Sequence, residues 1–419
     1  MKAVKETTPA PPSVSLPEAL IAKIDNIFIE RSAVASPISA RIFSSFPASK
    51  IHIVDGRPRS GEPGYLSARD FTIGKRNMFI TPFHGQFFKR CPGAKPDLTC
   101  CNYYVLNPGL QCDMNCSYCY LQSYINTPWL TIYSNLDQAL NELRQIAKSA
   151  GNCALRIGTG ETMDSLSLDP LTLFSRDLIG FFRETPAWRL EFKTKSDYVD
   201  QFLDMEHAGN VIVSWSINPQ NIVEREEHGT ASLHHRLQAA QKCLARGYPI
   251  AFHIDPMIWH PEWRESYGKL VDLVNENFLP TDVPYISLGA LRFQGEQRHM
   301  MRERFGFASL VNRAEMFPSQ DGKWRYDREL RNEMFKFIIQ KFREHSSQWR
   351  VFLCMETPES WIGTFATTAV QVPGLKPLFL QDPKVKSARL SSPRDSQIVC
   401  KIDSPQNQNS RPHLLESQQ

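Results

Sequence analysis

The stretch that decides the fold is Val211-Ile212-Val213-Ser214-Trp215-Ser216-Ile217, followed by a helical period over 233–246 and by Ile250-Ala251-Phe252-His253-Ile254. The two short runs are rich in β-branched and aromatic residues, and the segment between them has the length of a helix. This order is typical of a strand-helix-strand unit in which both strands run parallel. The sequence therefore predicts an α/β protein built on parallel strands.

The same alternation continues on both sides of this unit. We expect further helices over 136–150, 171–182, 199–208, 263–277 and 329–344, and further strands over 154–157, 190–193 and 285–291. Strand-helix alternation at this spacing predicts a parallel sheet whose faces are covered by helices. A barrel and a doubly wound sheet both satisfy this condition, and the alternation alone does not choose between them.

The chain has 419 residues, 42% of them hydrophobic, which is enough for one large core or two moderate domains. We expect a flexible arm over 1–18, an N-terminal α/β region over 19–100, a main domain over 101–372 and a disordered tail over 373–419. The formal net charge is only +4. That balance neither demands nor excludes a nucleic-acid partner, because a local basic groove is hidden in a total.

Ten cysteines are distributed along the chain, and several of them are clustered. Residues 1–17 lack the apolar core of a secretory signal, and no apolar run reaches the ~18 residues that a membrane span needs. We therefore expect a cytoplasmic protein without a membrane partner. In that compartment thiols persist, so clustered cysteines indicate a metal or redox site rather than disulfides.

The strongest chemical signal is Cys112-Asp113-Met114-Asn115-Cys116-Ser117-Tyr118-Cys119. Three thiolates within eight residues can surround one 4Fe–4S cluster, for which thiolates are the preferred ligands. Three ligands leave one iron open, and the amino and carboxylate groups of S-adenosylmethionine can chelate it. One electron then cleaves the sulfonium to a 5′-deoxyadenosyl radical. The alternative, a zinc site, usually needs a second ligand pair, which does not follow here.

The flanking sequence resembles the radical S-adenosylmethionine superfamily, and within it the spore photoproduct lyase family. The C-x₃-C-x₂-C spacing carries the superfamily resemblance. The resemblance extends over roughly 27–355. The blocks that carry it are 116–122 with 128–135, Arg189–Lys195 with Val199-Asp200, Trp215–Asn218 leading to 227–230 and Arg236-Leu237, and Gly247–Pro256 with His260, Trp263 and Tyr267.

This resemblance implies a partial (β/α)6 barrel of the radical S-adenosylmethionine type, with an N-terminal extension and with the cysteine loop after the first strand. It places the active site at the carboxyl ends of the strands, as parallel barrels generally do. Family positions that bind S-adenosylmethionine fall on Lys195 and Ser216. The implied partners are a low-potential electron donor of the flavodoxin or ferredoxin type and DNA that carries a thymine photolesion.

One position departs from the family. Its enzymes return a hydrogen atom to the substrate from a cysteine, and that cysteine falls on Glu161 when residues are counted back from Lys195 without a gap. Gly158-Thr159-Gly160-Glu161 instead resembles the Gly-Gly-Glu motif that receives the methionine ammonium in other radical enzymes. Gly158, Gly160 and Glu161 are therefore expected to bind the cofactor. A substrate-contacting acid and a plain loop carboxylate are the other interpretations of Glu161. Asp164 matches a family acid and is expected to hold the loop, and with Tyr118, Tyr120 and Glu161 it is expected to belong to the catalytic residues.

Tyr118 and Tyr120 match family tyrosines that are thought to relay hydrogen atoms, and simple packing over the cluster is the alternative. Cys91, Cys100 and Cys101 precede the loop without an assigned role. Basic residues next to aromatics recur at 292–293, 298–304 and 323–326, where they either stack a flipped-out base or form a solvated helix face and core edge.

Three functions follow. The first is lesion repair in DNA by a lyase of this family. The second keeps the radical chemistry and changes the substrate to a small molecule, RNA or peptide, which the loss of the cysteine at Glu161 favours. The third is a non-catalytic binding protein on the same fold, against which the intact Cys112, Cys116 and Cys119 count.

Overall fold

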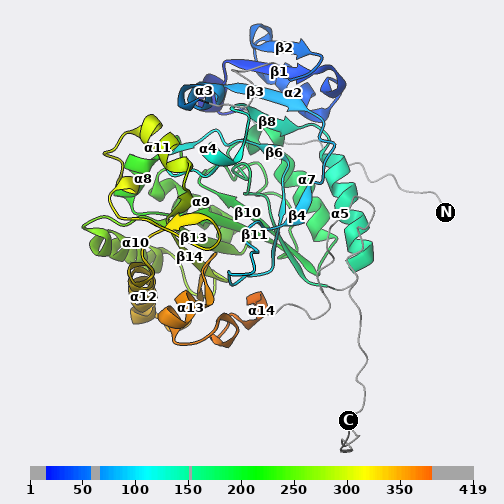
Figure 1. Cartoon of the computed structure of the whole chain (residues 1–419). Helices are drawn as coiled ribbons and strands as arrows, with labels where there is room; N and C mark the ends of the chain where they lie inside the picture. Colours follow the sequence, from blue (N-terminus) through cyan, green and yellow to red (C-terminus); the bar gives the residue numbers. More distant parts are fainter. Residues whose placement is uncertain (1–15, 58–66, 151–152, 380–419) are drawn as a thin grey trace, which may run out of the picture.

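A curled sheet forms the centre of the computed structural model, which describes residues 16–57, 67–150 and 153–379 (Figure 1). Its strand order is β18-β14-β13-β11-β10-β9-β5-β4, and all neighbouring pairs are parallel except β4 with β5. The strands are β4 (Phe88–Arg90), β5 (Tyr103–Leu106), β9 (Leu155–Gly158), β10 (Trp188–Thr194), β11 (Val211–Ser216), β13 (Ile250–Met257), β14 (Ile286–Ala290) and β18 (Val351–Leu353). The predicted partial barrel is confirmed, with β18 as a further parallel strand.

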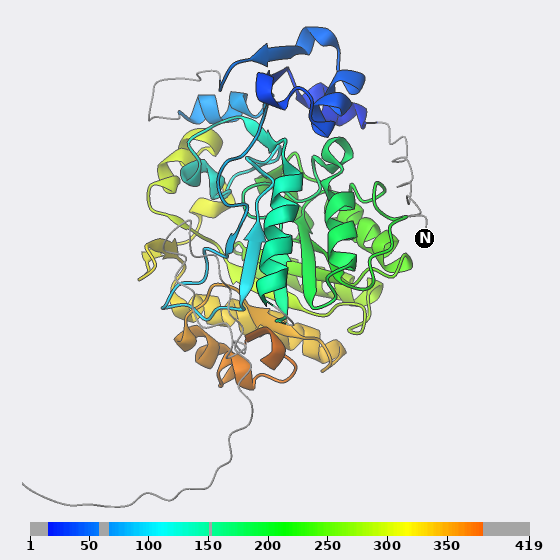
Figure 2. The same ribbon diagram turned by 90° about the vertical axis from the view of Figure 1, so that its right-hand side faces the viewer.

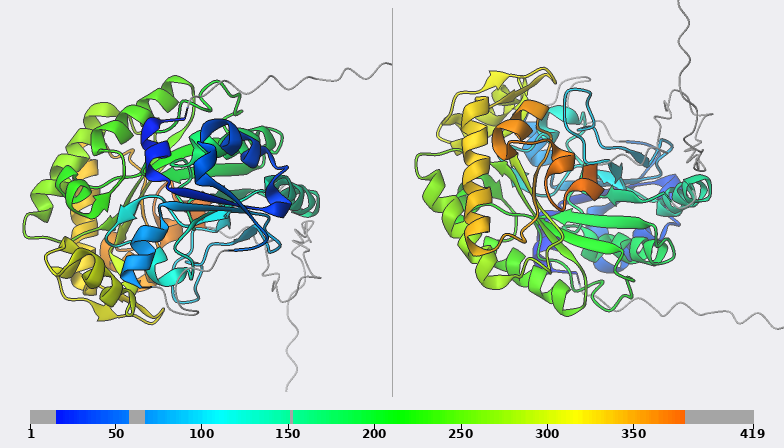
Figure 3. Two further views of the ribbon diagram at one scale, coloured as in Figure 1. Left: turned by 90° about the horizontal axis from the view of Figure 1, so that it is seen from above. Right: turned by 90° about the horizontal axis from the view of Figure 1, so that it is seen from below.

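Helices cover the convex face of this sheet, as the two end-on views show (Figure 3). They are α5 (Leu136–Ala150), α7 (Phe174–Arg183), α9 (Leu233–Ala245), α10 (Trp263–Asn277) and α12 (Arg328–His345). The helix expected over 171–182 is divided, because Leu173 takes a left-handed φ of 52° between α6 (Asp169–Thr172) and α7. Apolar strand residues such as Trp215 and Phe252 are completely buried. The hydrophobic effect of this layer is the main force that holds the helices to the sheet.

The opposite, concave face of the sheet is polar. Glu191 of β10 contacts His253 Nε2 at 2.7 Å, and the Nδ1 atom of His253 lies within hydrogen-bond distance of Ser287 Oγ. Arg156 lies 3.8 Å from the same Glu191 carboxylate. These four side chains come from four different strands, so the barrel interior is a connected polar layer. Buried polar groups must find such partners, because an unpaired one costs about 1–3 kcal/mol.

A second sheet, at the top of Figure 1, has the order β2-β1-β3-β8-β6. Its strands are β1 (Asn26–Glu30), β2 (Ile51–Val54), β3 (Asn77–Thr81), β6 (Gly109–Leu110) and β8 (Leu130–Tyr133). Helices α1 (Glu18–Lys23), α2 (Pro37–Ser45) and α3 (Ala68–Gly74) belong to the same part of the chain. The predicted boundary at residue 100 does not separate the two sheets, because β6 and β8 come after it while β4 joins the main sheet. The N-terminal region and the cysteine loop are thus built together.

The C-terminal elements lie in two places: α13 (Pro358–Phe365) and α14 (Lys376–Phe379) are at the lower end of the view in Figure 1, whereas α11 (Gln297–Phe305) lies beside α3 and α4 (Leu121–Tyr124), and Figure 2 shows the same arrangement from the side. A small sheet orders β15 (Arg292–Gln294), β17 (Lys323–Arg325) and β16 (Phe317–Pro318). The tail predicted from residue 373 begins too early, because Phe379 packs on Phe352 and Trp361 with ring centroids 5.7 and 5.0 Å away. The remainder of the predicted tail, 380–419, and residues 1–15 of the predicted arm lie outside the described residues.

The helix expected over 199–208 is wrong. The chain there forms turns with hydrogen bonds from Phe202 N to Val199 O and from Met205 N to Phe202 O. The Tyr248 hydroxyl donates to the carbonyl oxygens of Phe202 and Met205, at 2.9 and 3.3 Å. Ala208 then turns to a φ of 50°. Tertiary contacts to the carbonyls therefore replace the helical ladder.

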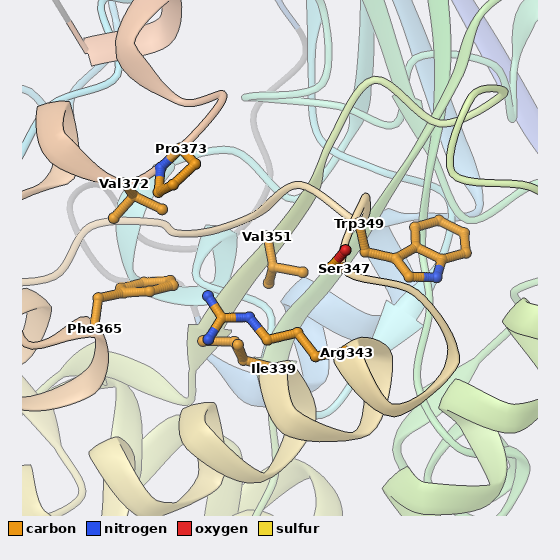
Figure 4. Close-up of a pocket in the computed structure, with 8 residues that line it drawn as sticks. All are labelled: Ile339, Arg343, Ser347, Trp349, Val351, Phe365, Val372 and Pro373. Atoms are coloured by element: carbon orange, nitrogen blue, oxygen red, sulfur yellow. The ribbon is translucent and has the colours of Figure 1, made fainter.

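A cavity of about 220 Å³ lies between α12, β18 and the chain near Pro373 (Figure 4). Its lining residues are Ile339, Arg343, Ser347, Trp349, Val351, Phe365, Val372 and Pro373. None of the residues predicted to act in catalysis lines it. No helix among the described residues is both long and apolar enough to cross a bilayer.

Gly158 offers a test of the barrel packing. A Cβ atom there would overlap the Tyr103 hydroxyl, whereas a Cβ atom at Gly180 in α7 meets nothing within 4 Å. We expect Gly158→Ala to lower the free energy of unfolding by about 1–3 kcal/mol because the interior must shift. Gly180→Ala should leave it unchanged or raise it by about 0.5–1 kcal/mol, since alanine is the better helix former. Urea unfolding of both variants measures the difference, and equal midpoints would contradict the packing.

Candidate active site

The cysteine loop leaves the carboxyl end of β5, which is the first parallel strand of the curled sheet along the chain. It passes through β6, then β7 (Asn115–Cys116), and ends at α4 (Leu121–Tyr124). β7 pairs antiparallel with β12 (Glu227–His228), so that Cys116 lies opposite Glu227. The loop therefore sits over the carboxyl ends of the strands, where the sequence predicts the active site.

Cys112, Cys116 and Cys119 lie close enough to influence one another. Burial raises the pKa of the Cys116 thiol to about 12, and it also raises the pKa of Cys112, with a contribution from Cys119 in both cases. Within the described residues no three His, Cys, Asp or Glu side chains converge on one metal ion. A four-iron cube takes each thiolate on a different iron, so its ligands surround it. The donor set fits such a cluster better than a zinc ion, and the ligand assignment stays a prediction.

Glu227 holds this loop from below. Its carboxylate accepts hydrogen bonds from the Tyr118 hydroxyl and, at 2.9 Å, from Asn218 Nδ2. Arg236 Nη2 lies 2.6 Å from it, and neither side chain of this ion pair is exposed to solvent. Burial acts to raise the pKa of Glu227, but Arg236 and Lys195 hold it below its usual value. The residue is therefore a carboxylate, and it fixes Tyr118 beside Cys119.

Glu226 is a second buried support. Its carbonyl oxygen accepts from Ser117 N at 2.8 Å, and its carboxylate accepts from the Ser117 hydroxyl. The same carboxylate accepts from Ser309 Oγ and Leu310 N, each at 2.6 Å. Two neighbouring glutamates thus connect the cysteine loop to α8 (Gln220–Glu226) and to the C-terminal segment. Glu227 stands within one of the family-like sequence blocks, but neither glutamate is predicted from the sequence to support the loop. Two glutamates at the end of a short helix usually face solvent, so no local pattern indicates their burial.

Lys195 reaches the same place from the end of β10. Its ammonium lies 5.6 Å from the Tyr118 ring centroid. Burial acts to lower the pKa of Lys195, but Glu227 and Cys116 raise it, so the side chain is cationic beside the thiols. Ser216 ends β11, and its carbonyl accepts from Arg236 Nη1 at 2.8 Å. The structure therefore brings the two predicted cofactor residues to one end of the barrel.

Asp164 supports the chain at this end of the barrel through hydrogen bonds to neighbouring protein groups. Its carboxylate accepts from Leu166 N, Ser167 N, Thr194 Oγ1 and Lys195 N at 2.6–3.0 Å. Burial raises its pKa, which these hydrogen bonds oppose. The predicted loop-holding function agrees with this geometry. Its catalytic role stays a prediction.

Glu161 lies just past β9 with half of its carboxylate engaged. Oε2 accepts from Asn107 Nδ2 and pairs with Lys89 Nζ at 3.1 Å, while Oε1 is buried and has no hydrogen-bond partner. A buried acceptor without a partner is costly, so a missing cation is the simplest explanation. An ammonium group fits this position. A Cβ atom at Gly158 would overlap the Tyr103 hydroxyl, and one at Gly160 would lie 2.9 Å from the Lys193 carbonyl oxygen. Packing within the protein therefore already explains both glycines.

The two tyrosines of the loop differ in their surroundings. Tyr118 is buried and bonded to Glu227, whereas 39% of Tyr120 is exposed and its hydroxyl donates to the Glu161 carbonyl oxygen. Burial and then nearby carboxylates raise the pKa of both phenols, which keeps them protonated. The geometry supports packing for Tyr118 and places Tyr120 beside Glu161.

Several of the basic residues that the sequence suggests for nucleic-acid binding already form ion pairs or hydrogen bonds within the protein. Arg292 pairs with Asp255 at 3.0 Å, and Arg325 pairs with Asp321. Arg298 lies 5.8 Å from the Trp324 ring centroid, and its Nε atom is buried without a partner. Lys323 keeps a pKa lowered to about 8 by burial and by Arg292. Among the described residues, Arg298 and Lys323 form no ion pair, so with Trp324 they can still contact a ligand.

The spore photoproduct lyase family model matches residues 23–347. The chain is 29% identical over 271 residues to the spore photoproduct lyase of Bacillus subtilis, covering 64% of this chain and 74% of that protein. It is 25% identical over 285 residues to the one from a Geobacillus species, covering 67% and 82%. A solved lyase mutant with bound AdoMet and dinucleoside spore photoproduct superposes with a TM-score of 0.69, 23% identity, and coverage of 78% of this chain and 98% of that one. Another lyase structure, complexed with dinucleoside spore photoproduct, superposes with a TM-score of 0.69 and 22% identity. The match covers 79% of this chain and 98% of that one. These structures share the fold.

Glu227 should contribute more to the free energy of unfolding than exposed glutamates of the neighbouring helix α8. Glu227→Ala leaves Arg236 and Lys195 buried without their anion, so we expect unfolding to become about 3–5 kcal/mol easier. Glu224, which is exposed on α8, is the matched control, and Glu224→Ala should stay within about 0.5 kcal/mol. Chemical denaturation measures both, and a Glu227→Ala variant as stable as the control would contradict the role of this carboxylate.

Proposed function

Because the chain belongs to the spore photoproduct lyase family, whose members are radical S-adenosylmethionine enzymes, we propose that it repairs a thymine photolesion in DNA by radical chemistry. The observation that carries the proposal is the cysteine loop, which is held by Glu226 and Glu227 at the carboxyl ends of the barrel strands, beside a buried cation and an unpaired carboxylate oxygen. A 4Fe–4S cluster with S-adenosylmethionine would supply one-electron cleavage of the sulfonium and a 5′-deoxyadenosyl radical.

The residues that would hold these groups follow from the site. Cys112, Cys116 and Cys119 would bind the cluster. Lys195 would pair with the cofactor's carboxylate and Ser216 would hydrogen-bond it, while Glu161 Oε1 would accept from its ammonium. Glu227 keeps Lys195 charged and Tyr118 in place, and Asp164 fixes the chain that carries Lys195. A reducing cytoplasm and a low-potential flavodoxin or ferredoxin would keep the thiols and the cluster in working form.

A lesion-containing strand is the substrate that agrees with the family. The lyase structures that share this fold hold dinucleoside spore photoproduct. In this chain Trp324 could stack a base, and Arg298 and Lys323 could contact the phosphates. The polar barrel interior offers hydrogen bonds to the edges of a base that enters it.

A second candidate keeps the radical chemistry and changes the substrate to a small molecule, RNA or peptide. Glu161, where the family's cysteine is expected, favours it, because a carboxylate has no weak S–H bond to give. The assay below separates the two candidates.

The proposal is tested by anaerobic reconstitution with iron and sulfide, reduction, and measurement of 5′-deoxyadenosine with and without thymine-lesion DNA. Lesion-dependent product together with restored thymines supports repair. Product that ignores the lesion supports the second candidate. A protein that binds no cluster and cleaves no cofactor overturns both.

Loss of one loop thiol should remove the cluster and the reaction together. We expect Cys116→Ala to bind less than about a tenth of the wild-type iron, because a cluster already short of one protein ligand loses a second. Cys243→Ala is the control, since Cys243 is buried in α9 and belongs to the helix packing. Iron and sulfide analysis, with 5′-deoxyadenosine by chromatography, measures both variants. Full iron and cofactor cleavage in Cys116→Ala would end the assignment.

A further inference from the structure

Repair of a joined thymine pair poses a requirement that the site described so far does not meet. Separation into two thymines changes no overall composition, so each hydrogen atom that the adenosyl radical removes must be replaced at a substrate carbon. The donor needs a weak bond to hydrogen, and among side chains the S–H bond of cysteine is the natural choice. Glu161 cannot donate in this way. The inference that follows rests on the proposed function.

Several thiols lie outside the cluster loop, and Glu161 is among the charged groups whose field acts on Cys91. Lys89 and Cys91 are two residues apart on the edge next to β5, where Lys89 pairs with Val105 and Cys91 N donates to Tyr103 O at 3.0 Å. Residues two apart along an extended strand face the same side. Lys89 points into the barrel, because its ammonium lies 3.1 Å from Glu161 Oε2. Cys91 therefore faces the same interior.

Glu161 provides the second observation at this point. Its side chain is 6% exposed and its Oε1 atom has no hydrogen-bond partner, so this oxygen can still accept from a polar group. The Tyr120 hydroxyl donates to the Glu161 carbonyl oxygen, which brings the cluster loop to the same spot. A substrate held between Tyr120, Glu161 and Cys91 would meet the cofactor on one side and a thiol on the other.

We propose that Cys91 is the hydrogen-atom donor of this enzyme, supplied from the strand edge beside β5 in place of the cysteine expected after β9. In the step, the Cys91 S–H bond breaks and a C–H bond forms at the substrate carbon radical. The thiyl radical left on Cys91 is returned to the thiol by one electron from the low-potential donor and one proton from water.

The surroundings of Cys91 keep it in the form that the step needs. Burial raises the pKa of Cys91, the Gly93 amide lowers it, and Cys100 and Glu161 raise it further. The Gly93 N–H reaches Cys91 Sγ at 3.4 Å and orients the sulfur. Only the protonated thiol carries a hydrogen atom to give. The Glu161 carboxylate therefore helps to keep the Cys91 thiol protonated.

Cys354 is the matched control because it is another interior thiol with a different neighbourhood. It follows β18, and its backbone N donates to Leu288 O at 2.7 Å. The charged groups nearest to it are Asp255 and Arg292, not Glu161 or Tyr120. It lies on the β14–β18 side of the sheet, whereas Cys91 lies at the β4–β5 edge.

The test uses the reconstituted full chain with dinucleoside spore photoproduct in D₂O, where S–H exchanges to S–D. Wild type and Cys354→Ser should place one deuterium in each repaired thymine pair. Cys91→Ala and Cys91→Ser should lose this deuterium, and the ratio of 5′-deoxyadenosine formed to lesion repaired should rise at least about tenfold.

A second measurement, thiol labelling, tests the position of Cys91 without any catalytic turnover. In the chain without cofactor, iodoacetamide should label Cys91 at least about tenfold more slowly when the dinucleoside lesion is bound, while Cys354 changes less. The inference alone is overturned if the wild type repairs the lesion and the Cys91 variants show the same ratio of 5′-deoxyadenosine to repaired lesion and the same deuterium in the thymine product. Absence of lesion-dependent 5′-deoxyadenosine in the wild type overturns the proposed function and the inference with it.

Discussion

The candidate site depends on the buried carboxylate of Glu227. It accepts from the Tyr118 hydroxyl and from Asn218, and it pairs with Arg236. A charge this deep in a protein is tolerated only when partners surround it, so the loop, the end of β11 and α9 must all be in place for it to exist. Its negative charge in turn keeps Lys195 cationic next to the thiols. One interaction therefore fixes both the loop that would hold iron and the cation that would hold the cofactor.

The curled sheet explains why these groups meet at one end. Successive parallel strands finish at the same edge, which places Glu161, Lys195 and Ser216 together although they are far apart in the sequence. Alternation along each strand sends apolar side chains beneath the helices and polar ones into the interior. The interior layer of Arg156, Glu191 and His253 is linked by contacts from strand to strand. The same geometry turns Lys89 and Cys91 inward at the edge.

Sequence reasoning reaches the parallel sheet and the family because strong local patterns carry them. The runs at 211–217 and 250–254 are mostly apolar and contain no glycine or proline, and three cysteines stand within eight residues. It fails where distant contacts decide: Tyr248 binds the carbonyls of 199–208, β8 joins the N-terminal sheet from beyond the loop, and Phe379 packs on Trp361. Glu226 and Glu227 are also hidden, because two glutamates after a helix usually face solvent. Their burial follows only from the folded loop above them.

The central claim is that three thiolates leave one iron of a 4Fe–4S cluster open for S-adenosylmethionine. Electron paramagnetic resonance of the reduced, reconstituted protein tests it most directly, with and without S-adenosylmethionine that carries ¹⁵N in its amino group and ¹⁷O in its carboxylate. The account predicts a cluster signal that changes when the cofactor is added and shows hyperfine coupling to both labels. A cluster signal that is unchanged by the cofactor, or a protein that binds zinc and forms no cluster, would contradict it.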